Sequence, residues 1–288
     1  EEHWPFLFQQ FLLSHQTSFA NKNQLIVTPS VSSAERIYQG LKSKIENGEA
    51  AHQIYLYPGL DASPYHSILP SIQDLYTRFR TLDQLLYCQE QDGLHLVVIA
   101  THESLLLKGP PPNFFADQRF SIHPDDIIEP LELASRLVEL GYTSNITVEE
   151  PGTFSRKGEI FDLYPISSGP VRINYFDEMI EAIHPINPTT GKSDRSTPLK
   201  GVDISVSPGV LVDNLYSTIL RNNIPMPSPG EKERYKKRID LFESFSRGEL
   251  PHDYVRYLPL FFEPESTSTL LDYFSPKNTI ISMVGFDQ

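Results

Sequence analysis

The residues best suited to chemistry in this sequence are the basic pair Arg156 and Lys157, which precede Gly158. They lie between two strand-like runs in the stretch PGTFSRKGEIFDLYP, residues 151–165. Basic side chains bind carboxylates and phosphates, and arginine does so with a planar fork of donors. The stretch therefore predicts either a solvated hairpin turn or a surface that meets an acidic partner.

The next strand candidate, PVRINYF at 170–176, can add side chains to such a surface. Side chains alternate between the two faces of a strand, so positions 171, 173 and 175 are expected to face a core. Arg172, Asn174 and Phe176 then face away from it. An arginine near an aromatic ring is typical of protein–protein hot spots. The pattern leaves an alternative open, in which Arg172 is solvated and Phe176 is covered by a neighbouring loop.

Motifs for catalysis, nucleotides and metals are missing from the sequence. There is no G-x-x-x-x-G-K-[ST] phosphate loop, and the residues before the first strand, 11–23, contain no glycine. There is also no H-E-x-x-H, no cysteine pair for zinc and no G-x-S-x-G. His102 and Ser104 could suggest a catalytic serine–histidine pair, but residues so close in sequence rarely converge on one point. They are therefore expected to begin and cap a helix. We predict no catalytic residue, no cofactor site and no metal site.

Charge and composition narrow the class of partner. Asp and Glu number 37 against 24 Lys and Arg, a formal net charge of -13, which repels phosphate and disfavours DNA as the ligand. No apolar run is long enough for a membrane span, and the single cysteine, Cys88, fits a buried thiol in a reducing cytoplasm. The start at Glu1 without methionine, and the end after a strand-like run, predict a fragment of a longer protein.

Strands and helices alternate in the first hundred residues, which predicts an α/β fold. Strands are expected at 24–28, 53–59 and 94–101, and helices at 32–45 and 72–86. The spacing of Ser32 and Glu35 predicts a capping box at the start of the first helix. The continuous apolar run at 94–101 is typical of a parallel strand covered on both faces.

A second region begins after the KGPPP stretch at 108–112, which predicts a boundary. A helix is expected from Pro130 to Leu140, with Gly141 as its stop. Short strands separated by turns then follow, which indicates an α+β, largely antiparallel unit. The IPMPSPG stretch at 224–230 predicts another boundary, followed by an amphipathic helix at 235–248.

Two motif clusters resemble known repair proteins. The runs EEPGTFSRKGEIFDLYP and PVRINYFDEMIEAIHPINPTTGKS resemble the region shared by UvrB and the transcription-repair coupling factor (Mfd), which binds UvrA. By position, Lys157 matches the basic residue of that pattern, with Arg156 beside it, and Arg172 and Phe176 match its arginine and second aromatic residue. The run at 246–282 resembles the coupling factor more than UvrB, and segment 58–72 is too short for the DNA-clamping hairpin of UvrB.

The resemblance implies three domains. Residues 1–118 would form a degenerate RecA-like (P-loop NTPase-like) domain that lacks the phosphate loop, similar to UvrB domain 1a. Residues 119–207 would form an inserted α+β UvrA-binding domain, similar to domain 2. Residues 208–288 would form a small, truncated adjoining domain, similar to domain 1b, whose chain returns to the first domain.

The resemblance also implies a function, namely a module that recruits UvrA to RNA polymerase stalled at DNA damage and so starts nucleotide excision repair. ATP hydrolysis, DNA translocation and the contacts with polymerase and DNA would belong to other parts of the full-length parent. Intramolecular contact with the motor and C-terminal parts is expected as well. Two alternatives are a UvrB-type ATP-dependent DNA-loading subunit and a purely autoinhibitory structural domain.

Overall fold

The computed structural model describes residues 22–46, 53–59, 71–90, 95–210, 262 and 266–285. The chain divides into two compact units, Glu1–Pro112 with Ser266–Gln288, and Asn113–Glu265. The stretch at 224–230 and the helix expected at 235–248 lie outside the described residues, as does most of the domain expected at 208–288.

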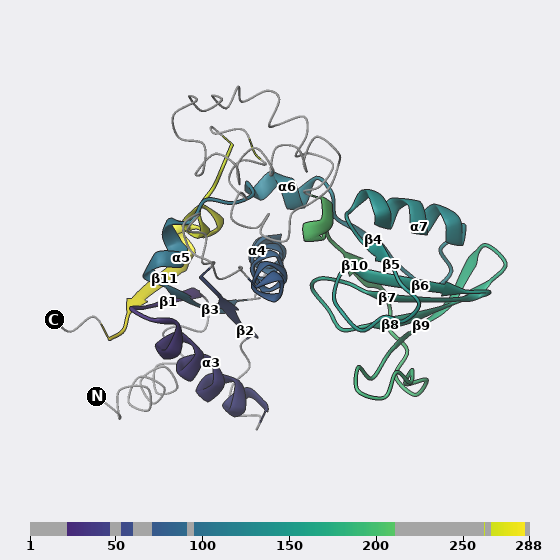
Figure 1. Cartoon of the computed structure of the whole chain (residues 1–288), viewed down its shortest axis with the longest axis horizontal. Helices are drawn as coiled ribbons and strands as arrows, with labels where there is room; N and C mark the ends of the chain where they lie inside the picture. Colours follow the sequence, from purple (N-terminus) through teal and green to yellow (C-terminus); the bar gives the residue numbers. More distant parts are fainter. Residues whose placement is uncertain are drawn as a thin grey trace, which may run out of the picture. The chain divides into compact units, whose positions relative to one another are not determined.

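The first unit is built on a parallel sheet of four strands in the order β11-β1-β3-β2. The strands are β1 (Asn23–Thr28), β2 (Gln53–Tyr57), β3 (Leu96–Thr101) and β11 (Thr279–Met283). The two long helices are α3 (Val31–Glu46) and α4 (Ile72–Glu90), and Figure 1 shows them on opposite faces of the sheet. The α/β class predicted from the sequence is confirmed.

Burial on both faces explains the apolar strands of this sheet. Every residue of β1 and β3 is buried. On one face, Ile37 and Leu41 of α3 pack in the same cluster as Ile26 and Ile99. Cys88 of α4 is buried too, as the sequence predicted. The edge strand beside β1 is β11, which comes from a distant part of the sequence.

The start of α3 differs from the prediction. The helix begins at Val31, and the Ser30 hydroxyl accepts a hydrogen bond from the backbone N–H of Ser33 at 3.3 Å. The capping box expected from Ser32 and Glu35 is therefore wrong, because the chain enters the helix two residues earlier and Ser30 satisfies a free N–H of the first turn.

Several short helical elements belong to one or the other of the two units. They are α5 (His102–Leu106), α6 (Pro112–Ala116) and the 3-10 turns η1 (Pro208–Val210), η4 (Leu270–Tyr273) and η5 (Pro276–Asn278). Thr101 caps α5 by accepting a hydrogen bond from the Ser104 N–H at 3.2 Å. The interpretation of this stretch as a capped helix start is confirmed.

The second unit holds a sheet of five strands whose spatial order, β5-β6-β7-β8-β9, is that of the sequence. The strands are β5 (Thr143–Ser144), β6 (Thr153–Lys157), β7 (Ile160–Tyr164), β8 (Val171–Phe176) and β9 (Met179–Pro185). All neighbours are antiparallel except β5 and β6. The predicted antiparallel arrangement of the longer strands is confirmed.

One face of this sheet is covered, and we call the opposite one the outer face. Figure 1 shows α7 (Pro130–Glu139) along the covered side, together with the two-stranded ribbon of β4 (Phe120–Ile122) and β10 (Val202–Ile204). The rings of Phe154 and Phe161 stack in the core with centroids 5.5 Å apart, and Leu133 and Leu137 of α7 are fully buried. Gly141, at φ 81°, follows the end of α7, as predicted.

Candidate protein-docking face

The hairpin β6–β7 carries the basic pair that the sequence singled out. Lys157 pairs with Ile160, so the two-residue turn consists of Gly158 and Glu159. Gly158 has φ 65°, a left-handed conformation that a residue without a Cβ adopts at no steric cost. The predicted hairpin is confirmed, but Arg156 and Lys157 are the last residues of β6 and not part of its turn.

The two basic residues are neighbours in β6 and therefore point to opposite faces of the hairpin. Arg156 pairs with Phe161, whose ring is buried in the core, whereas its neighbour Lys157 belongs to the outer face. Burial raises the pKa of the Tyr175 phenol, on the covered face, to about 12, and the Arg156 charge opposes that rise. Both basic side chains are exposed. Arg156 therefore lies on the side of the hairpin opposite to Lys157.

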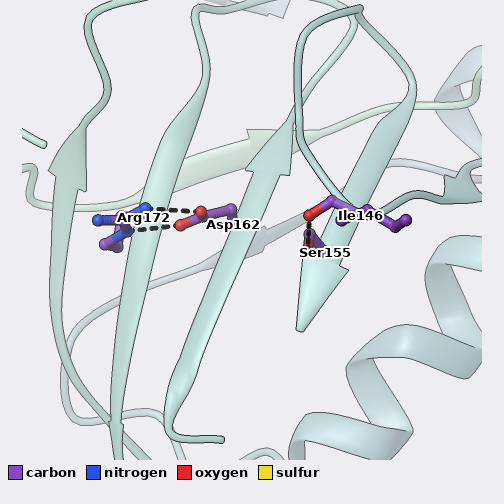
Figure 2. Close-up of polar contacts among 4 residues, drawn as sticks. All are labelled: Ile146, Ser155, Asp162 and Arg172. Atoms are coloured by element: carbon purple, nitrogen blue, oxygen red, sulfur yellow. Dashed lines mark hydrogen bonds and ion pairs between the residues drawn. The ribbon is translucent and has the colours of Figure 1, made fainter. Parts of the chain in front are cut away.

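Arg172 lies in the middle of the outer face and is paired with Asp162 directly opposite on β7. Its Nε donates to Oδ1 at 2.6 Å and its Nη2 donates to Oδ2 at 2.7 Å (Figure 2). The side chains of Arg172 and Asp162 are 25% and 18% exposed, and these hydrogen bonds raise the pKa of Arg172. The alternative of a simply solvated Arg172 is wrong, because the carboxylate holds both donors of one guanidinium edge.

Phe176 ends the same strand and is 68% exposed. It pairs with Met179 across the β8–β9 turn, and Met179 forms an antiparallel bridge with Ile127, which is 75% exposed. Opposite residues of an antiparallel pair point to the same face. These three side chains form what we call the apolar cluster (Ile127, Met179, Phe176). The alternative in which a loop covers Phe176 is wrong.

One border of the outer face is closed by a loop. The hydroxyl of Ser155, which lies opposite Asp162, donates to the backbone oxygen of Ile146 at 3.0 Å. Figure 2 shows Arg172, Asp162 and Ser155 side by side on three neighbouring strands, with the Ile146 loop over the last of them. Ser155 is buried, so the accessible part of the outer face lies over β7, β8 and β9.

The features of this face suit binding. Arg172 offers a charged fork on the same face as exposed apolar area, and such a combination is enriched at interface hot spots. Across the described ranges, no group of three or more His, Cys, Asp or Glu side chains is arranged to hold a metal ion. Within the same residues, none of the helices is both long enough and apolar enough to cross a bilayer.

Sequence reasoning placed Arg172 and Phe176 on one face correctly, but it missed their neighbours. Asp162 alternates with Phe161 and Leu163, so its outward direction was readable from the strand pattern. That Asp162 lies opposite Arg172 can be known only from the register of β7 and β8. The signal for Ile127 was absent, since its single bridge to β9 leaves no periodic pattern.

Comparison with known proteins shows what this region is similar to. Residues 120–205 match the model of the UvrB interaction domain. Across 276 residues, 93% of its length, the chain is 26% identical to a transcription-repair-coupling factor of Staphylococcus epidermidis. The chain is related to the transcription-repair-coupling factors. It is also 26% identical to that of Bacillus subtilis over 91% of its length, and 25% identical to that of Staphylococcus aureus over 96%.

The resemblance to coupling factors that the motifs indicated is thereby confirmed. The chain spans only 22–23% of the length of these coupling factors. The outer face with its apolar cluster, from Ile127 to Pro185, falls within the residues matched by the UvrB interaction domain.

Proposed function

We propose that this chain is a recruiting module of a transcription-repair coupling factor, and that residues 119–207 bind UvrA. In this proposal the parent protein engages RNA polymerase stalled at DNA damage, and the module brings in the nucleotide-excision-repair machinery. The proposed contacts are Arg172, Phe176 and Lys157 on the outer face, with Arg156 contributing from the other side of the hairpin.

The observation that carries the proposal is the exposure of Phe176 on the same face as a half-buried, hydrogen-bonded arginine, inside a stretch that matches the UvrB interaction domain. An exposed aromatic ring presents apolar area at a low entropic cost, and arginine supplies directional hydrogen bonds. The net charge of -13 favours a protein partner over nucleic acid.

Titration with UvrA tests the proposal. Charge reversal by Arg172→Glu should weaken binding by about 2 kcal/mol or more, roughly thirtyfold, because a hot-spot donor is replaced by a repelled carboxylate. Arg195→Glu is the matched control, since Arg195 is an exposed arginine of the same unit and makes the same change in charge. Equal affinity of wild type and Arg172→Glu contradicts the assignment of this face.

We further propose that the parallel sheet of the first unit is a degenerate RecA-like domain without nucleotide chemistry. Its support is the parallel order β11-β1-β3-β2 together with a sequence that has no phosphate loop. ATP hydrolysis, DNA and polymerase binding are assigned to other parts of a cytoplasmic parent. A UvrB-type loading subunit would instead bind ATP with micromolar affinity, and equilibrium dialysis with labelled ATP separates the two.

A further inference from the structure

We infer that Asp162 is a positioning residue, which holds Arg172 so that the outward edge of its guanidinium receives a carboxylate of the partner. This inference rests on the proposed function of the outer face. It concerns a residue that the sequence motifs did not single out and that would not itself contact the partner.

The hydrogen-bond inventory of Arg172 leads to this role. A guanidinium has five N–H donors in a rigid fork and no acceptor. Asp162 takes the Nε donor and one Nη2 donor, at 2.6 and 2.7 Å. Three donors remain, two on Nη1 and one on Nη2. One donor from each of these nitrogens forms the end-on edge of the group, and the second Nη1 donor points back toward Cδ. A carboxylate fits that edge with two parallel hydrogen bonds.

The surroundings make the pair a fixed feature of the sheet. Asp162 and Arg172 lie directly opposite each other on adjacent strands, where side chains are closest. Both are largely covered, so solvent screens their attraction less than it screens exposed charges. Among the residues that the structure describes, Asp162 is the one carboxylate bonded to Arg172. An arginine ordered in this way loses less conformational freedom when the partner binds.

The spacing of Arg172 and Phe176 on the outer face indicates which groups the partner surface should carry. Phe176 stands four residues beyond Arg172 on β8, roughly 13 Å away at a rise of about 3.3 Å per residue. Phe176 and the rest of the apolar cluster lie at the end of that strand. The partner surface is therefore expected to carry an acidic side chain about this distance from an apolar socket.

Two other roles of Asp162 predict the opposite effect of its removal on binding, so one measurement separates them from positioning. If Asp162 only adds negative charge, its removal should strengthen binding to an acidic surface. If Asp162 competes with the partner for Arg172, its removal should strengthen binding as well. Positioning predicts the opposite, because an arginine released from Asp162 must be ordered again on binding.

The experiment is a double-mutant cycle with UvrA and the full 288-residue chain. Asp162→Ala should weaken binding about tenfold, Arg172→Ala about thirtyfold, and the double variant no more than Arg172→Ala alone. Glu159→Ala is the control, since it removes one exposed charge from the neighbouring turn. Unchanged or tighter binding of Asp162→Ala overturns the inference, and so do additive losses.

A second measurement does not depend on UvrA. In nitrogen-15 NMR spectra, the Nε–H of Arg172 should give a distinct signal with slow solvent exchange. Asp162→Ala should abolish this signal, and the near-isosteric Asp162→Asn, which retains one of the two acceptors, should speed its exchange, while the thermal melts stay cooperative. An unchanged signal in a folded variant overturns the inference. If wild type does not bind UvrA, the proposed function fails, whereas this signal still decides whether Asp162 orders Arg172.

Discussion

Phe176 gives the most direct quantitative test of the docking face. A phenylalanine can bury roughly 200 Å², and Phe176 is 68% exposed in the free protein. About 140 Å² therefore remain to be covered, which at about 25 cal/mol per Å² corresponds to about 3 kcal/mol. Incomplete coverage by the partner and the area retained by an alanine Cβ reduce this figure. We expect Phe176→Ala to weaken UvrA binding by about 2 kcal/mol, roughly thirtyfold.

Isothermal titration calorimetry measures this effect and adds a second observable. Losing at most about 140 Å² of apolar burial should make the heat-capacity change of binding less negative by at most about 60 cal/mol/K. Folding stability should fall by less than about 1 kcal/mol, because most of the ring is already in water. Val138→Ala on α7 is the control, since Val138 is also exposed and lies on the helix of the covered face.

Two outcomes would refute this reasoning about Phe176. Binding of Phe176→Ala within a factor of two of wild type would exclude the ring from the interface. An equal loss with Val138→Ala would mean that the affinity responds to any lost apolar side chain of the unit.

Two further predictions concern the stability of the second unit. Tyr175→Phe should raise the free energy of unfolding in urea by about 1 kcal/mol at neutral pH, since among the described residues the buried Tyr175 hydroxyl has no hydrogen-bond partner. Burial raises the pKa of Tyr175 in the folded protein from 10.0 to about 12, so the stability of the wild type should fall between pH 10 and 12. The stability of Tyr175→Phe should fall less over this range, and equal losses would contradict the prediction. Gly209→Ala should cost about 2 kcal/mol in the same assay, because its Cβ would collide with the carbonyl oxygen of Gly141, whereas Gly169→Ala, with nothing within 4 Å, should cost far less; equal costs would contradict the collision.

Several elements were readable from the sequence because local chemistry decides them. The run at 94–101 is apolar at nearly every position, as a strand covered on both faces requires, and it forms β3. Helix α7 starts at Pro130 and is followed by Gly141 in a left-handed conformation, both at the predicted places. The ribbon of β4 and β10 was missed, since three-residue strands leave no periodic signal.

The sequence by itself determined which residues of β8 face outward, because the alternation of a strand is a local property. It also supplied the motifs that led to the family. Only the tertiary structure decided what those residues meet. Register pairs Arg172 with Asp162, ten positions away, and sets Lys157 rather than Arg156 on the same face as that pair. Such pairings depend on the turn at Gly158 and on strands coming together in space, so alternation along one strand cannot specify them.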